Sequence, residues 1–240
     1  MVTNSNIVSP YEMPVERDAE SRTTAVFGQG LDFSSGDILA GNSRFIYDAV
    51  KRILDIVAAG LLLIFLAPLM GLIALAVGAT SGWPIIFSQK RLTDGCKVFT
   101  LYKFRTMRRD AEAKSGAVWA SARDPRITPL GRFLRVSRLD ELPQLVNVLI
   151  GDMSLIGPRP ERPEIAAELS KELASFDDRH AVKAGITGLA QIMGGYASTM
   201  RGYRRKVALD LIYIRNRSLL LDLKIAIKTI AVILTGSGAR

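Results

Sequence analysis

The longest uncharged stretch of the chain runs from Ile56 to Gln89. Within it, residues 56–77 are apolar apart from glycines and one proline. As a helix, at 1.5 Å per residue, this segment would be about 33 Å long, close to the thickness of a bilayer's hydrocarbon core. It begins too late in the chain for a signal peptide. The pattern predicts a membrane segment, although a helix buried on all sides of a soluble core has the same composition.

Pro68 interrupts this run, because proline lacks the amide proton of a helical hydrogen bond and clashes with the preceding turn. The two arms, 56–67 and 69–77, would rise about 18 Å and about 14 Å, so neither would cross the bilayer alone. Lys and Arg residues flank the run equally on both sides, which favours a re-entrant hairpin with both ends on one membrane face. A proline-kinked spanning helix stays the alternative.

The hydrophobic pattern divides the chain into three parts. Residues 1–40 lack sustained apolar periodicity and predict a poorly ordered leader without a chemical role. Residues 41–80 hold the predicted membrane hairpin, broken at Pro68. Residues 81–240 predict one domain of the α+β class, mostly helical, with a small β-hairpin and amphipathic helices.

Short elements follow the membrane segment. Pro84–Ser88 and Lys97–Lys103 are rich in β-branched and aromatic residues, and Thr93-Asp94-Gly95 between them is typical of a hairpin turn. A helix is predicted over Met107–Lys114 and a surface loop over Ser115–Arg126.

Two helix starts carry proline signals. Thr128-Pro129 pairs an N-cap residue with proline at the first helical position. A second helix is predicted over Asp140–Leu149, with Pro143 in its first turn and Gly151 at its end.

The remaining elements are a short segment, a turn and three helices. They are predicted at Met153–Ile156, Gly157–Pro160, Pro163–Ser175, Tyr203–Asn216 and Leu219–Leu234. The last helix has one apolar face, so it could lie flat in the membrane interface or pack on the protein's own core.

The composition narrows the chemistry. The chain has 32 Lys and Arg against 23 Asp and Glu, with one cysteine and one histidine. This argues against a disulfide scaffold, a zinc finger and a Cys/His protease, and any metal would be held by oxygen. The positive excess suits nucleic acid, phospholipid headgroups or a phosphorylated substrate. The basic run at Tyr203–Lys206 has no aromatic stacking platform, which argues against nucleic acid.

Asp140 and Glu141 are adjacent carboxylates at a predicted helix start, where the helix dipole favours negative charge and would keep Asp140 ionised. Carboxylates hold Mg²⁺ and cationic side chains neutralise phosphate, so these acids suit a Mg²⁺–diphosphate site. Taken singly, Asp140 would more often be a plain N-cap. The cations that stand in short polar motifs are Lys103, Arg105, Arg126, Arg135, Arg138 and Arg159.

Three further features have plain structural interpretations. Gly185–Gly188 is too short for a phosphate loop and is interpreted as a turn. His180 stands alone and is interpreted as a surface or structural histidine, and Cys96 has no identifiable base partner.

Several motifs occur in one order along residues 45–236, and together they resemble the bacterial sugar transferases, the small monotopic phosphoglycosyl transferases. The motifs are Lys51–Asp55, Tyr102–Met107, Asp124–Thr128, Leu139–Gln144, Gly151–Ser154, Gly157–Pro160, Gly185–Gly188 and Asp210-x-x-Tyr213.

The resemblance implies an enzyme of the bacterial inner (cytoplasmic) membrane, with residues 81–240 as a catalytic domain on the cytoplasmic face. It implies transfer of a sugar 1-phosphate from a nucleotide diphosphate sugar, usually UDP-linked, to undecaprenyl phosphate, with release of UMP and with Mg²⁺ as cofactor. Such a step initiates exopolysaccharide or other glycoconjugate synthesis. Membrane lipid is a further expected partner, and nucleic acid is not expected as one. A homo-oligomer is possible.

By position, the resemblance makes Asp140 the nucleophile of a ping-pong reaction and Glu141 its partner in binding Mg²⁺. It makes Pro68 the break of the hairpin and Arg135 a phosphate contact. The other expected substrate contacts are Lys103, Arg105, Asp124, Arg126, Arg159 and Gln191.

The chain departs from the family pattern at Ala67, Ala184 and Gly195, where the family often has Ser, Pro and Arg. A non-catalytic membrane adaptor that binds anionic lipid through its basic body is the alternative function.

Overall fold

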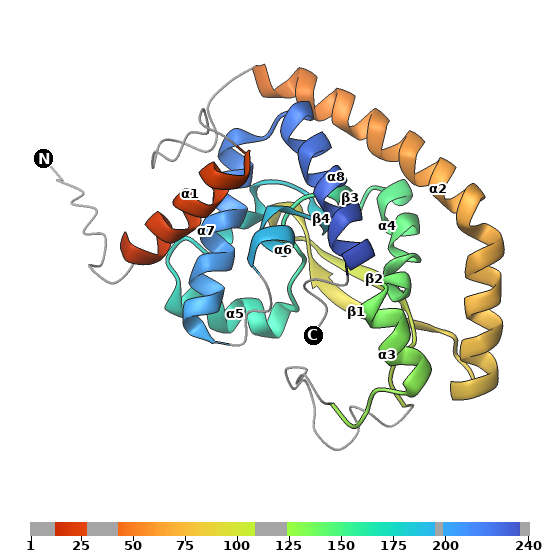
Figure 1. The fold of residues 1–240 in the computed structure, drawn as a ribbon. Coiled ribbons are helices and arrows are strands. Elements are labelled where there is room, and N and C mark those ends of the chain that lie inside the picture. Colours follow the sequence, from red (N-terminus) through yellow and green to blue (C-terminus); the bar gives the residue numbers. More distant parts are fainter. Residues whose placement is uncertain (1–12, 28–42, 109–123, 195–198, 236–240) are drawn as a thin grey trace, which may run out of the picture.

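A computed structural model describes residues 13–27, 43–108, 124–194 and 199–235, and helices make up most of it (Figure 1). In chain order the α-helices and strands are α1 (Met13–Phe27), α2 (Ser43–Ser81), β1 (Ile86–Leu92), β2 (Val98–Phe104), α3 (Pro129–Val136), α4 (Gln144–Ile150), β3 (Met153–Ile156), α5 (Pro163–Glu172), β4 (Ala184–Thr187), α6 (Leu189–Gly194), α7 (Met200–Asn216) and α8 (Leu219–Thr235). Three short 3-10 helices join them: η1 (Asp94–Cys96), η2 (Leu139–Glu141) and η3 (Asp177–Ala181). The predicted α+β, mostly helical class is confirmed.

Helix α2 curves around the outside of the other elements (Figure 1). Its inner side buries Ala59, Ile73 and Val77, whereas Ile64 and Phe65 on its outer side are 76% and 81% exposed. Within the described residues, α2 is the one helix long and apolar enough to cross a membrane, with a mean hydropathy of 2.7 in its most apolar window. Only 11% of that window is buried, which argues against a soluble-core helix and suits contact with lipid.

Pro68 lies inside α2, and the helix continues through it. A proline removes one helical hydrogen bond, and a long helix can absorb that loss by bending. Figure 1 shows α2 turning in its second half. The structure therefore has a bend within one helix where the sequence predicts a break between two arms.

The prediction of a poorly ordered leader is wrong for α1. Ala19 and Thr23 are fully buried, and α1 packs against α7. The sequence signal is weak because the apolar residues of α1 show little helical periodicity, and Phe27 is its one large buried side chain among those described. The other residues of the 1–40 segment lie outside the described part of the chain.

The sheets are small. Strands β1 and β2 form the predicted antiparallel hairpin, with Ile86 opposite Phe104 and Leu92 opposite Val98. Strands β3 and β4 form a parallel pair that the sequence did not predict, because Gly185–Gly188 is interpreted there as a turn. Gly157 allows this approach, since a Cβ on it would lie 2.4 Å from the Lys183 carbonyl oxygen.

Two other predictions change. Met107 pairs with Ile127 in an isolated antiparallel bridge and is not helical, while residues 109–123 of the predicted helix and loop lie outside the described ranges. Helix α8 packs on the protein's own core, one of the two alternatives for its amphipathic pattern, and the interfacial location stays a prediction. Leu221 and Ile225 pack into the core, whereas the opposite side leaves Leu220, Leu223, Ile227 and Ile230 more than half exposed.

Candidate functional site

The site begins where β2 ends and α3 packs against it. The Thr128 hydroxyl accepts a hydrogen bond from the Gly131 amide, which confirms the predicted N-cap of α3. Gly131 lies directly against Thr106, since a Cβ there would be 2.0 Å from the Thr106 carbonyl oxygen. One turn later, Arg135 Nε donates to Thr106 Oγ1 at 2.9 Å. The cap and the glycine together fix the position of Arg135.

The carboxylate pair follows α3 in η2. Arg138 takes a left-handed conformation, with φ of 59°, and reverses the chain between α3 and η2. Asp140 and Glu141 are 6% and 7% exposed. The predicted helix start at Asp140 is wrong, because Asp140 lies in η2 and α4 begins at Gln144, with Pro143 as its N-cap residue.

Helix α4 holds this turn against β2. The buried Asn147 donates from Nδ2 to the Thr100 carbonyl at 2.7 Å and accepts from the Tyr102 amide at 3.1 Å. At the other end of α4, Arg52 from α2 donates to the carbonyl oxygens of Val148 and Leu149. The membrane-type helix and β2 thus both position the helix that follows the acids.

Glu141 is bound by two cations from different elements. Lys103 Nζ of β2 lies 2.9 Å from Glu141 Oε1, and Arg159 Nη2 lies 2.6 Å from the same oxygen. Burial would raise the pKa of Glu141, but the charges of Arg159 and Lys103 hold it well below its usual range. Burial lowers the pKa of Lys103, whereas Glu141 raises that of Arg159. Glu141 is therefore an ionised anchor for both cations.

Asp140 differs from Glu141 because its carboxylate has no hydrogen bond to any other described residue. Burial raises its pKa, and the neighbouring Glu141 adds to this, while Lys103, Arg135 and Arg159 oppose it. Asp140 is a buried carboxylate with cations around it and no bonded partner among the residues that the structure describes.

Hydrogen bonds from β4 and from Arg179 hold the turn that carries Arg159. The Gly185 amide donates to the Pro158 carbonyl at 2.8 Å, so β4 fixes the Gly157–Pro160 turn. Arg179 Nη2 donates to the Arg159 carbonyl at 2.8 Å and also contacts Asp210 Oδ2 at 2.6 Å.

A second buried ion network therefore lies behind the carboxylate pair. Glu161 pairs with Lys206. Burial alone would raise the pKa of Glu161, but the positive charges of Lys206, Arg179 and Arg91 outweigh burial and lower this pKa to about 2. The sequence pattern does not reveal this network, although Asp210 stands in one of the motifs. Lys206, which belongs to the basic run at Tyr203–Lys206, contacts Glu161.

Other predicted site residues lie around this centre. Asp124 and Arg126 pair with each other at 2.6 Å, and the hydrogen bonds from Arg126 lower the pKa of Asp124. Arg105 follows β2 and donates its amide to the Ile85 carbonyl. Gln191 donates to the Ile186 carbonyl at 2.7 Å, and no contact between described residues joins it to Asp140.

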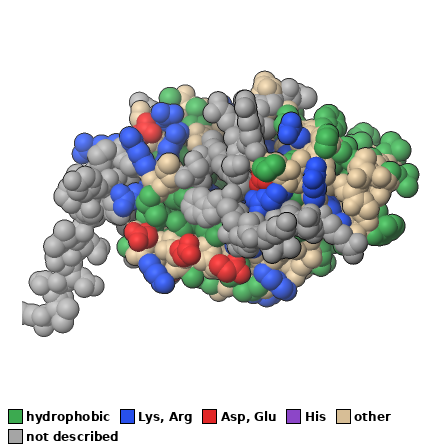
Figure 2. Space-filling model, turned by 90° about the horizontal axis from the view of Figure 1, so that it is seen from below, with side chains coloured by type: hydrophobic (Ala, Val, Ile, Leu, Met, Phe, Trp, Pro, Cys, Tyr) green, Lys and Arg blue, Asp and Glu red, His purple; other side chains and the backbone are tan. Residues whose placement is uncertain are grey.

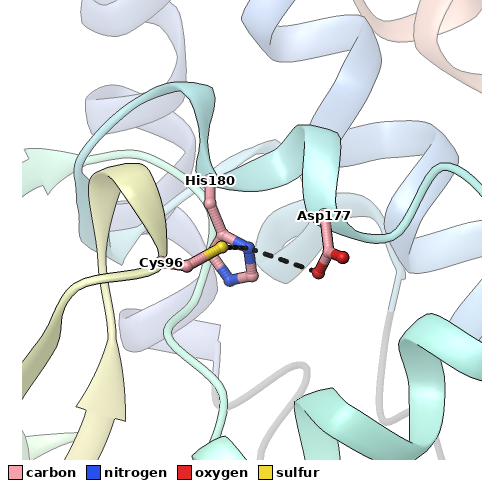
Figure 3. A group of neighbouring side chains, drawn as sticks. All are labelled: Cys96, Asp177 and His180. Carbon is pink, nitrogen blue, oxygen red and sulfur yellow. Dashed lines mark hydrogen bonds and ion pairs between the residues drawn. The ribbon is translucent and has the colours of Figure 1, made fainter.

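Cys96 and His180, interpreted as isolated in the sequence, lie together. Cys96 Sγ is 3.4 Å from His180 Nδ1, and Asp177 Oδ1 is 3.9 Å from the same nitrogen (Figure 3). The spacing of 84 residues between Cys96 and His180 left no sequence signal for this pair.

Figure 2 shows the surface that lies below the view of Figure 1. Lys and Arg side chains gather near its centre around a small acidic patch, and hydrophobic side chains gather at the end where α2 lies. Cationic side chains held in fixed positions beside carboxylates are of the kind that bind phosphate. The long apolar helix α2 suggests that the protein associates with a membrane.

Residues 46–236 match the family described as bacterial sugar transferase, and the chain belongs to this family. It is 44% identical over 195 residues to a UDP-N-acetylgalactosamine-undecaprenyl-phosphate N-acetylgalactosaminephosphotransferase of Aeromonas hydrophila, a match that covers 81% of this chain and 46% of that protein.

Two further relatives match over more of their own length. A UDP-glucose:undecaprenyl-phosphate glucose-1-phosphate transferase of Caulobacter vibrioides is 41% identical over 82% of this chain and 74% of its own. The exopolysaccharide production protein PSS of Rhizobium leguminosarum is 40% identical over 78% of this chain and 96% of its own. The match covers less than half the length of the Aeromonas protein and of a glucose phosphotransferase of Komagataeibacter xylinus, so the chain spans only part of some curated relatives.

Proposed function

We propose that this chain is a phosphoglycosyl transferase that moves a sugar 1-phosphate from a UDP-sugar to undecaprenyl phosphate and releases UMP. The observation that carries the proposal is Asp140, a buried carboxylate that borders Lys103, Arg135 and Arg159 and has no bonded partner within the described residues. The names of the relatives support the acceptor and the reaction class.

In the first step, an Asp140 carboxylate oxygen attacks the sugar-bearing phosphorus of the donor. The bond from that phosphorus to the bridging oxygen breaks, UMP leaves with the bridging oxygen, and an aspartyl-phosphosugar remains. In the second step, an oxygen of undecaprenyl phosphate attacks the same phosphorus and displaces the Asp140 carboxylate. Splitting the transfer lets a water-soluble donor and a lipid acceptor use one site in turn.

The cations act on the charge that develops on phosphate. Arg159 and Lys103 are positioned by Glu141, so they are already oriented when phosphate enters. Arg135 is fixed by Thr106 on the α3 side. Glu141 is a positioning residue for these cations, and Asp140 alone supplies an unbonded nucleophile.

The carboxylate oxygens of Asp140 and Glu141 are also suited to binding a Mg²⁺ ion. Asp140 offers both carboxylate oxygens, and on Glu141 the short contacts of Lys103 and Arg159 fall on Oε1, while Oε2 has only a 3.4 Å contact from Arg159. Oxygen ligands of this kind are those that Mg²⁺ prefers. A bound Mg²⁺ would neutralise diphosphate charge; Asp140 and Glu141 would hold it.

For the membrane, we propose that α2 enters one leaflet of the inner membrane and returns, with the domain on the cytoplasmic face. The exposed outer side of α2 and the exposed side of α8 would contact lipid. The bend near Pro68 would let both ends of α2 reach the same face. Ala49→Cys and Thr80→Cys, each in a Cys96→Ser background, should react with an impermeant maleimide from the cytoplasmic side. Labelling from opposite sides would instead show a spanning helix.

The activity test uses detergent-solubilised chain, a panel of UDP-sugars, undecaprenyl phosphate and Mg²⁺, with UMP release as the readout. One donor should give UMP, and Asp140→Asn should lower its release by about a thousandfold or more. Asp178→Asn, an exposed acid on η3, is the matched control and should retain activity. Undiminished release in Asp140→Asn removes Asp140 from the mechanism. Salt-sensitive liposome binding without UMP from any donor would favour the adaptor.

A further inference from the structure

The second cluster of chemically reactive side chains lies at the tip of the β1–β2 hairpin. Cys96 comes from η1, and Asp177 and His180 come from η3 (Figure 3). Their sulfur, nitrogen and oxygen atoms lie within 4.8 Å of one another. We propose that these three side chains bind one Zn²⁺ ion, at a site separate from the Asp140 carboxylate.

The distances fit a tetrahedral ion. Zinc bonds of about 2.3 Å to sulfur and about 2.0 Å to nitrogen place the two ligand atoms about 3.5 Å apart at a tetrahedral angle. The observed separation of Cys96 Sγ and His180 Nδ1 is 3.4 Å. Asp177 Oδ1 lies 3.9 Å from the nitrogen and within 4.8 Å of the sulfur, and its side chain is 62% exposed, so it can turn toward the ion.

The directions of approach distinguish an ion site from a catalytic triad. In a nucleophile–histidine–acid relay, the nucleophile and the acid contact different nitrogens of the imidazole ring. Here the thiol and the carboxylate both approach Nδ1. Burial also raises the pKa of Cys96, which does not activate it as a nucleophile. Convergence on one point is what a shared cation requires.

The choice of metal follows from the ligands. A thiolate and an imidazole suit the borderline-soft Zn²⁺ and do not suit Mg²⁺, which prefers oxygen. Binding releases the thiol proton to solvent, and three protein ligands leave one position for water.

Hydrogen bonds on both sides position the two elements that carry the ligands. Ser170 Oγ donates to Asp177 Oδ1 at 2.8 Å. On the hairpin side, Thr93 Oγ1 donates to the Asp152 carbonyl and accepts from the Ala184 amide. An ion would therefore clamp η1 to η3, the turn that also carries Arg179 and its bond to the Arg159 carbonyl.

The test exploits the single cysteine and single histidine of the sequence. Full-length chain without a histidine tag is titrated with Co²⁺ in detergent, and thiolate-to-cobalt absorption is followed. One Co²⁺ per chain should give this band, and one Zn²⁺ should displace it, whereas Mg²⁺ in excess should not. Cys96→Ser should abolish the band, and His180→Gln should weaken binding at least tenfold. Asp178→Asn, the neighbouring acid outside the cluster, should bind as the unaltered chain does.

A second measurement needs no substitution. Zn²⁺ should slow maleimide alkylation of Cys96 in the unaltered chain at least tenfold, and a chelator should restore the rate. Absence of both the cobalt band and this protection would overturn the proposal. So would Zn²⁺ binding of equal strength in Cys96→Ser, because the ion would then lie elsewhere. Neither readout depends on transferase activity, so failure here is distinguishable from failure of the proposed function.

Discussion

Asp140 and Asp210 are both buried aspartates surrounded by cations, but only one of them is paired. Burial raises the pKa of each, and nearby cations oppose the shift in each. Asp210 accepts two hydrogen bonds from Arg179, at 2.6 and 3.1 Å. Asp140 accepts none from any described residue. The pKa direction therefore does not separate the structural acid from the candidate nucleophile, whereas the hydrogen-bond partners do.

The two regions are also connected. Arg179 is bonded to Asp210 on one side and to the Arg159 carbonyl on the other, and Arg159 reaches Glu141. The ion pairs around Asp210 thus help to position the cations around Asp140. A site that must accept phosphate keeps its cations oriented by Glu141 and leaves the neighbouring carboxylate unbonded.

The largest expected effects come from neutralising each aspartate in turn. Asp140→Asn should lose activity without a fall in Tm, because a buried charge without a bonded partner costs stability. Asp210→Asn should do the reverse and lower stability by about 3 kcal/mol, since it removes the charged acceptor of two Arg179 hydrogen bonds and leaves the more distant Glu161 as the carboxylate nearest to that buried guanidinium among the contacts described. Thermal unfolding in detergent and UMP release, measured on both variants, check this. Equal loss of Tm in the two variants would remove the distinction between them.

The pH dependence of activity and that of stability should also differ between the two regions. Glu161 has a pKa of about 2, below the unfolded value near 4.5, so its contribution of about 3 kcal/mol is complete above pH ~4.5 and is lost as the pH falls toward 2. Asp140 has a raised pKa, and its ionised form is the proposed nucleophile, so activity should begin to fall before the loss of the Glu161 contribution is complete. Parallel profiles of UMP release and Tm test this order. Activity that persists until the fold is lost would contradict it.

Arg159→Lys should lower kcat/KM by about a hundredfold, because Lys cannot reproduce the planar, two-nitrogen contact with Glu141 and phosphate. Its Tm should change little, since the side chain stays cationic. Lys171→Arg, an exposed position on α5, serves as control for surface charge chemistry. A loss no larger than in that control would show that Arg159 has no role beyond its charge.

The smallest effect is expected from Thr128→Ala. It removes the N-cap of α3 and should cost about 1 kcal/mol, measured as a small fall in Tm. Thr128→Ser, which keeps the capping oxygen, should restore most of it. An unchanged Tm in Thr128→Ala would mean that packing against Thr106 alone holds α3.

Local signals in the sequence predict much of this fold. Thr128-Pro129 and Gly151 mark helix ends correctly because capping depends on the nearest few residues. The β1–β2 hairpin follows from a turn between two β-rich segments. The membrane character of α2 follows from length and composition alone.

Features that depend on distant contacts were missed or wrong. The β3–β4 pair rests on backbone approach at Gly157 and Gly185, which a four-residue pattern does not reveal. The sequence identifies Asp140 and Glu141 as the important pair, but it does not predict their 3-10 turn. It also does not predict that only Glu141 is bound by Lys103 and Arg159, because these cations come from other elements. The Cys96–His180 contact is equally a product of the tertiary fold.

Trapping the covalent species is the most direct measurement. The chain is mixed with its donor sugar and Mg²⁺ without undecaprenyl phosphate, quenched, digested and analysed by mass spectrometry. A sugar-phosphate adduct on the peptide containing Asp140, at the Asp140 side chain, is the expected result. An adduct on another side chain, or UMP release by an Asp140→Asn chain at the full rate, would contradict it.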